Sequence, residues 1–186
     1  GSVKAAEFRV SSDGCYVVTG GLGGVGLQVA RWLAESGAKH LVLLGRKAMP
    51  LREAWSSLAS ADPLYERVAA VQELERLGVR VDAAAVDVSD VKQLAAVLDR
   101  IRGCGTTVRG VIHAAGVPDH KLVAELDNEG LASVLRPKAV GAWNLHELTR
   151  NDPLDFFVCF SSASSILGAE GQAYYAAANA LLDGLI

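Results

Sequence analysis

A run of glycines directly after an aliphatic strand is the feature that most restricts how this chain can fold. The segment from Cys15 to Thr19 has the apolar character of a buried strand, and the next residues up to Gly26 read Gly-Gly-Leu-Gly-Gly-Val-Gly. Glycines allow positive φ and a close approach of the backbone, and a following helix presents free N–H groups at its N-terminus. The sequence therefore predicts a strand–turn–helix unit that binds a dinucleotide pyrophosphate.

Two overlapping glycine spacings occur in this turn. Gly21, Gly23 and Gly26 fit the general dinucleotide fingerprint, while Gly20, Gly24 and Gly26 fit a tighter version of it. A glycine pattern alone is a weak signal, and its position between a strand and a helix makes it meaningful. We expect the whole turn to contact the cofactor: Thr19, Gly20, Gly21, Leu22, Gly23, Gly24, Val25 and Gly26.

Short aliphatic strands alternate with helical patterns along the rest of the chain. Further strands are predicted at 40–44, 79–86, 107–113 and from 156 to about 161. This order indicates βαβ units, and the 186 residues, 51% hydrophobic with 19 glycines, suit one α/β domain. We predict a Rossmann-like, doubly wound parallel sheet over residues 15–186. Residues 1–14 are expected to be a connector that includes a possible tag remnant.

Composition and residue spacing argue against several other classes of protein. The net charge of -3 gives no general attraction for nucleic acid or for an anionic membrane. No apolar run reaches the roughly 18 residues that a membrane span needs, so a cytoplasmic protein is expected. Cys15, Cys104 and Cys159 form no paired motif, and the four histidines lack metal-ligand spacing. Neither a disulfide framework nor a metal site is predicted.

The end of the second strand predicts which cofactor is preferred. An NAD-binding site would usually place an acidic residue here to bond the ribose 2'-hydroxyl, but this chain has Gly45-Arg46-Lys47. Arg46 can instead pair with a 2'-phosphate, which favours NADPH. The alternative is that Arg46 and Lys47 are an ordinary solvated pair in a loop.

Other strand ends supply further candidate residues. Small residues at Ala114-Ala115-Gly116 would let a flat cofactor ring lie against the backbone near the crevice where open α/β sheets bind ligands. His113 is interpreted as a packed residue at the strand end, and Asp90 as the N-cap of a helix over 91–102. Two helical pieces divided at Pro63 are expected within 49–77, without identifiable chemistry.

Hydroxyl groups dominate the region after the last predicted strand. That strand ends near Ser161 and Ser162, and a helix is predicted from about Gln172. Tyr175 and Asn179 are four residues apart and share one face of this helix. A hydroxyl at a strand end that faces a tyrosine can hold a carbonyl oxygen between two donors, which indicates carbonyl reduction. The alternative is that hydroxyl-rich loops followed by tyrosine-bearing helices are common surface features.

From Tyr16 to Leu185 the chain resembles ketoreductase domains of modular type I polyketide synthases, and those of fatty-acid synthases, within the short-chain dehydrogenase/reductase superfamily. The usual superfamily member has lysine four residues after the tyrosine, whereas the synthase domains have asparagine there and a lysine on an earlier helix. Here Asn179 follows Tyr175, and the segment that begins at Pro137 resembles that earlier helix, with Lys138 at the matching position. The motifs that carry the resemblance occur in the family order: the glycine turn, Arg46, Asp87, His113-Ala-Ala-Gly116, Lys138, Ser162, Tyr175 and Asn179.

The resemblance implies NADPH-dependent reduction of a β-ketoacyl thioester to a β-hydroxyacyl thioester. Its implied partners are an acyl carrier protein, whose phosphopantetheine arm holds the acyl chain, and other domains of the same synthase. Ser162 and Tyr175 would bind the ketone oxygen, and Tyr175 would supply the proton. Lys138 would stabilise the phenolate, while Asn179 would hold a water or the lysine. Asp87, with the adjacent Val88, would contact the adenine, and Lys138 and Tyr175 would also bind the cofactor.

Two departures from the family pattern affect these expectations. Pro118-Asp119-His120 stands where ketoreductases of one stereochemical class have Leu-Asp-Asp, and Leu167 stands where the other class often has tryptophan. This leans toward the first class. We also expect the C-terminal strand and the substrate-covering lid to be absent. The competing readings are a stand-alone carbonyl reductase, a redox-silent epimerising domain and a non-catalytic scaffold domain.

Overall fold

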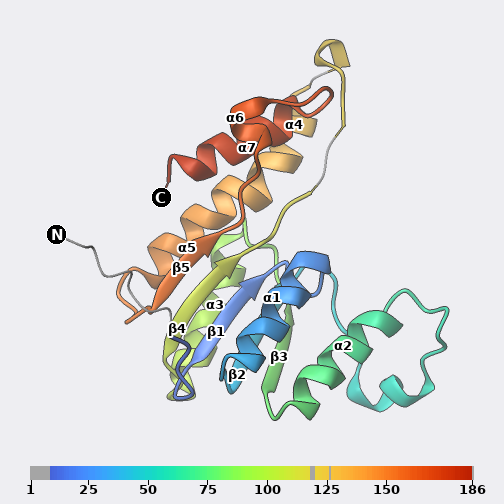
Figure 1. The fold of residues 1–186 in the computed structure, drawn as a ribbon, viewed down its shortest axis with the longest axis vertical. Coiled ribbons are helices and arrows are strands. Elements are labelled where there is room, and N and C mark those ends of the chain that lie inside the picture. Colours follow the sequence, from blue (N-terminus) through green and yellow to red (C-terminus); the bar gives the residue numbers. More distant parts are fainter. Residues whose placement is uncertain (1–8, 118–119, 126, 186) are drawn as a thin grey trace.

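One parallel β-sheet organises the chain (Figure 1). The structure is a computed structural model that describes residues 9–117, 120–125 and 127–185. Its five strands lie in the order β3-β2-β1-β4-β5, and every neighbouring pair is parallel. The strands are β1 (Cys15–Thr19), β2 (His40–Gly45), β3 (Arg80–Ala85), β4 (Val108–His113) and β5 (Phe156–Cys159). The predicted Rossmann-like α/β fold is confirmed.

Helices connect the strands largely where the sequence predicts them. The α-helices are α1 (Gly24–Glu35), α2 (Tyr65–Arg76), α3 (Val91–Gly103), α4 (Asn128–Leu135), α5 (Gly141–Thr149), α6 (Ser164–Leu167) and α7 (Ala173–Asp183). The described residues also form two 3-10 helices, η1 (Arg52–Ser57) and η2 (Val123–Glu125), and one π-helical turn, η3 (Arg136–Val140). Asp90 caps α3 as predicted, because its carboxylate accepts from the backbone N–H groups of Lys92 and Gln93.

Three details differ from the predictions. The helical piece before Pro63 is the 3-10 helix η1, in which no residue is buried. The last strand ends at Cys159, before the expected Ser161, because the next residues turn away to form the serine-rich segment. That segment contains the short helix α6, which its run of polar residues did not indicate.

The two faces of the sheet carry separate apolar cores. In β1, Tyr16 and Val18 join the cluster that includes α1 and α2, whereas Cys15 and Val17 join the one that includes α3 and Leu145 of α5. Figure 1 shows the corresponding layers of helices on either side of the strands. Because both faces are covered, β1 is buried at all five positions and β2 at the four between its ends, without the alternation of a half-exposed strand.

A third, smaller cluster holds α7 beyond the carboxyl ends of the strands (Figure 1). Val134 of α4 packs with Tyr174 and Ala178 of α7, and Tyr175 lies at the edge of this cluster. The hydroxyl of Tyr174 donates a hydrogen bond to the carbonyl oxygen of Asp127. The apolar contacts of this cluster hold α7, which carries Tyr175, against α4.

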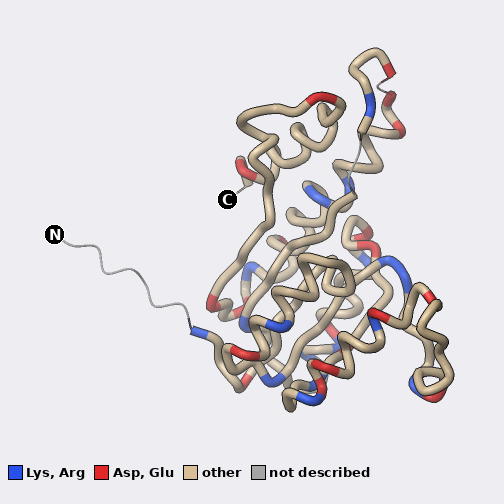
Figure 2. The backbone as a smooth tube through the Cα atoms, turned by 45° about the vertical axis from the view of Figure 1, so that its right-hand side comes forward, with Lys and Arg blue, Asp and Glu red and all other residues tan. Residues whose placement is uncertain are grey.

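Charges of both signs are interspersed along the chain (Figure 2). None of the helices in the described ranges combines the length and apolarity needed to cross a bilayer.

Candidate active site

A cavity of about 590 Å³ opens at the carboxyl ends of the first four strands. Its wall combines the glycine turn, the ends of β2 and β3, and the segment after β4. The predicted cofactor residues that line it are Gly20, Leu22, Gly23, Gly24, Val25, Gly26, Arg46, Asp87, Val88, Ala114, Ala115 and Gly116. Four residues that were also expected to contact the cofactor do not line it, namely Thr19, Gly21, Lys138 and Tyr175. Thr19 is fully buried, and the Gly21 N–H donates to the carbonyl of Leu44. The cavity thus lies where open α/β sheets bind ligands.

The glycine turn is closed too tightly to admit side chains at some positions. A Cβ on Gly26 would lie 2.1 Å from the carbonyl oxygen of Gly20, which itself has a φ of +64°. By contrast, a Cβ on Gly24 would meet nothing within 4 Å. Gly26 is therefore required for the fold of the turn, whereas Gly24 leaves open space toward the cavity.

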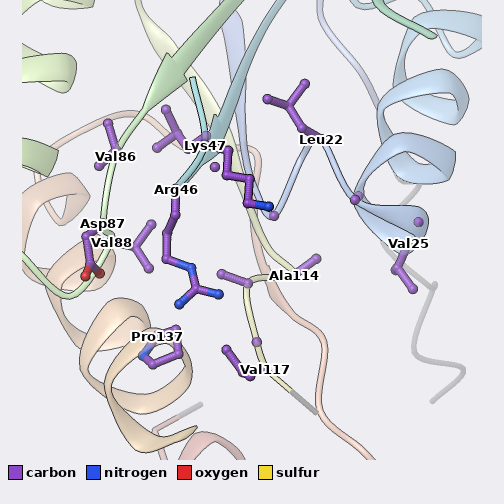
Figure 3. A pocket seen from close by; sticks show the side chains of 18 of the residues that line it. Leu22, Val25, Arg46, Lys47, Val86, Asp87, Val88, Ala114, Val117 and Pro137 are labelled. Atoms are coloured by element: carbon purple, nitrogen blue, oxygen red, sulfur yellow. The ribbon is translucent and has the colours of Figure 1, made fainter. Parts of the chain in front are cut away.

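Three cationic side chains line the cavity: Arg46 and Lys47 from the end of β2 and Arg67 from α2. Figure 3 shows Arg46 extending into the cavity, with Asp87 on one side and Ala114 on the other. Within the described residues, none of the three cations forms an ion pair with an acidic side chain. This uncompensated charge suits an anionic group of a ligand.

Asp87 also lines the cavity, and its carboxylate is held by local hydrogen bonds. Its Oδ1 accepts from the backbone N–H of Ser89 at 2.9 Å and from the Ser89 hydroxyl at 2.7 Å. The side-chain oxygen of Gln93 accepts from the Asp87 N–H at 3.1 Å. These contacts fix the carboxylate at the rim, where Figure 3 shows it.

Lys138 lies in the π-helical turn η3 between α4 and α5 and is only 4% exposed. Pro137 precedes it and has no N–H, so the regular α-helical hydrogen bonding is interrupted there. The ammonium nitrogen of Lys138 donates to the carbonyl oxygen of Phe160 at 2.8 Å and lies 5.4 Å from the centroid of the Tyr175 ring. A Cβ on Gly116 would be 3.6 Å from the same nitrogen, which therefore lies beside the cavity wall.

Burial lowers the pKa of Lys138, and the negative charge of Asp183 is among the groups that oppose this shift. An ammonium group has three N–H donors, and Phe160 is its only hydrogen-bond acceptor among the described residues. Burying a cation with so few partners costs free energy. A buried, under-bonded lysine beside a cavity is typical of a functional site and not of a solvated surface charge.

Ser162 follows Phe160 by two residues and is partly buried. Its Oγ accepts from the Ser164 N–H at 3.2 Å and lies 3.0 Å from the Ser164 hydroxyl, which can donate to it. When both Ser164 groups donate, the hydroxyl proton of Ser162 stays free to bond another acceptor. Further along the segment, the Ser165 hydroxyl donates to the carboxylate of Asp183 at 2.6 Å. The serine segment is thus tied to the end of α7.

Asn179 lies on the same helix as Tyr175, four residues further on, so the two share a helix face as predicted. Its side chain is fully buried. Its Nδ2 donates to the carbonyl oxygen of Tyr175 at 2.7 Å, so the amide is bonded to its own helix. Its Oδ1 is buried and has no hydrogen-bond partner among the described residues. An unsatisfied buried acceptor is costly, and it suits a donor such as water or an ammonium group.

Comparison with known proteins agrees with this geometry. A family model described as the KR domain matches residues 14–186. The chain belongs to the KR domain family. It is 44% identical over 185 residues to 6-methylsalicylic acid synthase of Aspergillus niger, covering 99% of this chain and 10% of that protein. It is 42% identical over 188 residues to a phenolphthiocerol/phthiocerol polyketide synthase protein of Mycobacterium tuberculosis. That match covers 100% of this chain and 10% of the mycobacterial protein. The chain thus spans about a tenth of these curated relatives.

Solved structures of ketoreductases share the fold of this KR domain. An N-terminal ketoreductase from the macrolactin assembly line has a TM-score of 0.83 at 33% identity, with 98% of this chain and 35% of that chain covered. A structure of A-type ketoreductases from a modular polyketide synthase has a TM-score of 0.79 at 41% identity. The match covers 100% of this chain and 37% of that chain. The chain therefore has the fold of the oxidoreductase class whose members use nicotinamide cofactors.

Sequence reasoning missed several residues of the KR domain cavity. Arg67 is the most informative, since the segment 49–77 was expected to carry no identifiable chemistry. Only the docking of α2 on the sheet brings Arg67 to the cavity, and nothing in its local pattern distinguishes it from a surface arginine. The other lining residues not predicted are Leu44, Gly45, Lys47, Val86, Val117 and Pro137.

Part of the stereochemical motif falls outside the described residues, namely Pro118 and Asp119. His120 packs on Gly171, where an added Cβ would lie 2.6 Å from its ring, and the Lys121 N–H donates to the Gly171 carbonyl at 2.8 Å. Leu167 is 81% exposed. His120 therefore packs against the segment between Ser162 and Tyr175, which also contains Leu167. Among the described residues, no group of three side chains could hold a metal ion.

Proposed function

We propose that this KR domain reduces a β-ketoacyl thioester to a β-hydroxyacyl thioester with NADPH, as part of a polyketide or fatty-acid synthase. The observation that carries the proposal is the position of Lys138. Its ammonium group is held at the Phe160 carbonyl, next to the Tyr175 ring and beside the cavity wall. A lysine–tyrosine pair next to a dinucleotide-type cavity suits proton transfer to a carbonyl oxygen.

The proposed chemistry divides between the cofactor and the side chains. When bound, NADPH supplies the hydride that adds to the ketone carbon. The hydroxyl groups of Ser162 and Tyr175 donate hydrogen bonds to the ketone oxygen while its negative charge grows. Tyr175 then transfers its proton to that oxygen, which leaves a phenolate. The role of Ser162 is supported by the Ser164 groups, which can satisfy its oxygen and leave its own proton free.

Lys138 and Asn179 complete the proposed proton transfer. The ammonium group of Lys138 stabilises the phenolate by its charge, and the low polarity around a buried lysine strengthens that attraction. The free Oδ1 of Asn179 supports a role in holding a water or the lysine, from which the phenolate recovers a proton.

The proposed NADPH site is supported by charge and by space. The glycine turn and the N-terminus of α1 would hold the pyrophosphate, and Arg46, Lys47 and Arg67 would bind the 2'-phosphate. Asp87 and Val88 would contact the adenine, while the backbone of 114–116 would support the nicotinamide. Thr19 and Gly21, which do not line the cavity, would hold the glycine turn in place through their hydrogen bonds to Ala115 and Leu44. Lys138 and Tyr175 would contact the nicotinamide end.

The proposed substrate is presented by an acyl carrier protein through its phosphopantetheine arm. Ile166 and Leu167, which follow Ser162 in the chain, are 86% and 81% exposed. Such exposed apolar side chains next to a reactive hydroxyl suit contact with an acyl chain. We also propose that residues 15–186 form the NADPH-binding domain and that 1–14 connect it to a preceding part of the synthase.

The test is to follow NADPH oxidation by the synthase that carries this domain, with a short β-ketoacyl thioester as substrate. We expect one β-hydroxyacyl thioester for each NADPH consumed, and the presence of Asp119 together with the lack of a tryptophan at Leu167 predicts the configuration of the Leu-Asp-Asp class. Chiral chromatography of the product measures that configuration. NADPH binding without turnover would instead support a non-catalytic scaffold, and loss of both would contradict the cofactor site as well.

A further inference from the structure

His113 is the last residue of β4 and is only 1% exposed, and both of its ring nitrogens have hydrogen-bond partners. Its Nδ1 lies 2.7 Å from the hydroxyl oxygen of Thr19, at the start of the glycine turn. Its Nε2 lies 2.8 Å from the main-chain carbonyl oxygen of Lys138. A single buried ring thus joins β1, β4 and the π-helical turn.

The partners determine where the imidazole proton resides. A carbonyl oxygen can only accept, so Nε2 must carry the hydrogen that is donated to Lys138. Burial lowers the pKa of His113 to about 4, so the ring is neutral near pH 7 and Nδ1 is an acceptor. The Thr19 hydroxyl then donates to Nδ1, while its oxygen accepts the Ala115 N–H at 3.2 Å. The hydrogen bonds run in one direction from the cavity wall to His113, and His113 donates in turn to the lysine backbone.

The π-helical turn approaches His113 closely because a glycine follows it. A Cβ on Gly141 would lie 3.2 Å from Cε1 of His113 and 2.6 Å from Cγ2 of Val88. Lys138 is consequently held at two points: its carbonyl oxygen by His113 and its ammonium nitrogen by the Phe160 carbonyl. Because the lysine is held both at its backbone and at its ammonium group, few side-chain conformations would move that group away from the Tyr175 ring.

We propose that His113 is a positioning residue, which fixes the backbone of Lys138 relative to Thr19 and Ala115 and so holds its ammonium group at Tyr175. This rests on the catalytic role proposed above for Lys138. His113 itself touches neither substrate nor cofactor in this scheme. A buried histidine that served packing alone would instead be replaceable by any side chain of similar volume.

Two substitutions separate positioning from packing. His113→Gln places an amide donor near the position of Nε2 and can still donate to the Lys138 carbonyl. His113→Asn has its polar atoms near the position of Nδ1, so it can reach Thr19 but not Lys138. His146→Gln, on the exposed side of α5, is the control. All variants are made in the synthase that carries the domain, and the dissociation constant of NADPH reports whether each one is folded.

We expect His113→Asn to lower kcat about tenfold or more while KM and NADPH binding change little, because only the proton-transfer geometry is disturbed. His113→Gln should retain kcat within about threefold of the wild type. In the reverse direction, oxidation of a β-hydroxyacyl thioester requires the phenolate, so its rate rises with pH. This rise should move to higher pH in His113→Asn and stay in place in His113→Gln.

A spectroscopic measurement tests the same inference without turnover. Long-range ¹H–¹⁵N spectra should show His113 with a protonated Nε2 and an unprotonated Nδ1, and the ¹³C titration of the Lys138 side chain should change only in His113→Asn. The opposite tautomer, or equal effects of the two substitutions on kcat and on this titration, would overturn the positioning role. A wild type that binds NADPH but does not reduce the thioester would contradict the proposed function and leave the spectroscopic criterion for His113 in force.

Discussion

The ammonium nitrogen of Lys138 lies 5.4 Å from the centroid of the Tyr175 ring, although the two residues belong to different helical segments on either side of β5. The lysine reaches this position by passing the segment that leads to Ser162, whose Phe160 carbonyl it bonds. The buried amine thus joins the segment that leads to Ser162 with the helix that carries Tyr175. The roles proposed for them can be separated by substitution.

Tyr175→Phe should lower kcat by roughly 10²–10⁴ because it removes only the proton donor. NADPH binding should remain intact, since the phenylalanine ring fills the same space. Tyr174→Phe is the matched control: it is the neighbouring residue, but its hydroxyl bonds the Asp127 carbonyl and faces the α4 side. Steady-state kinetics with a β-ketoacyl thioester compare the two. Comparable losses in both variants would show that Tyr175 has no special role.

Arg46→Ala and Arg67→Ala should each raise the dissociation constant of NADPH about tenfold or more and that of NADH much less, because NADH lacks the 2'-phosphate. Arg76→Ala, an exposed arginine at the end of the same helix as Arg67, is the control and should change neither constant. Fluorescence titration with both cofactors measures the difference. If Arg67→Ala behaves like Arg76→Ala, the third cation contributes nothing to cofactor preference.

Gly26→Ala should destabilise the domain by about 1–3 kcal/mol, because the new methyl group would collide with the Gly20 carbonyl. The clash is with main-chain atoms, so relieving it would require the whole turn to shift. Gly24→Ala lies in the same turn with open space around it and should leave the free energy of unfolding unchanged or slightly higher. Urea unfolding compares the two variants. Equal stabilities would mean that the turn relaxes around a side chain at position 26.

The free energy of unfolding should fall in mild acid because of His113. Its pKa in the folded domain is about 4, below the value of about 6.5 in an unfolded chain. The unfolded chain therefore takes up a proton that the folded domain excludes, so this stability is complete above pH 6.5 and is lost as the pH falls toward 4. The loss approaches about 3 kcal/mol. Urea unfolding between pH 7 and pH 4.5 should show this fall in the unfolding free energy in the wild type and a much smaller fall in His113→Gln. An equal fall in both would contradict the role of His113 in the pH dependence.

Several features of the site were predictable because their causes are local. A short apolar run before a glycine turn and a helix of period 3.6 can each be recognised in a few residues, so β1, the glycine turn and α1 follow from 15–35. For the same reason Tyr175 and Asn179 were expected on one helix face, and Asp90 was expected to cap α3. In each case the deciding contacts lie within a few residues of one another.

The sequence by itself determined the order of strands and helices, the glycine-lined turn and the set of polar residues available to the site. Only the tertiary structure decided that Lys138 is buried against Tyr175, that α2 brings Arg67 to the cavity, and that His113 bonds the lysine backbone. The physical reason is distance along the chain: these contacts join segments separated by many residues. Whether they form depends on how the helices pack on the sheet and on where a π-helical turn places one side chain, and local periodicity contains neither.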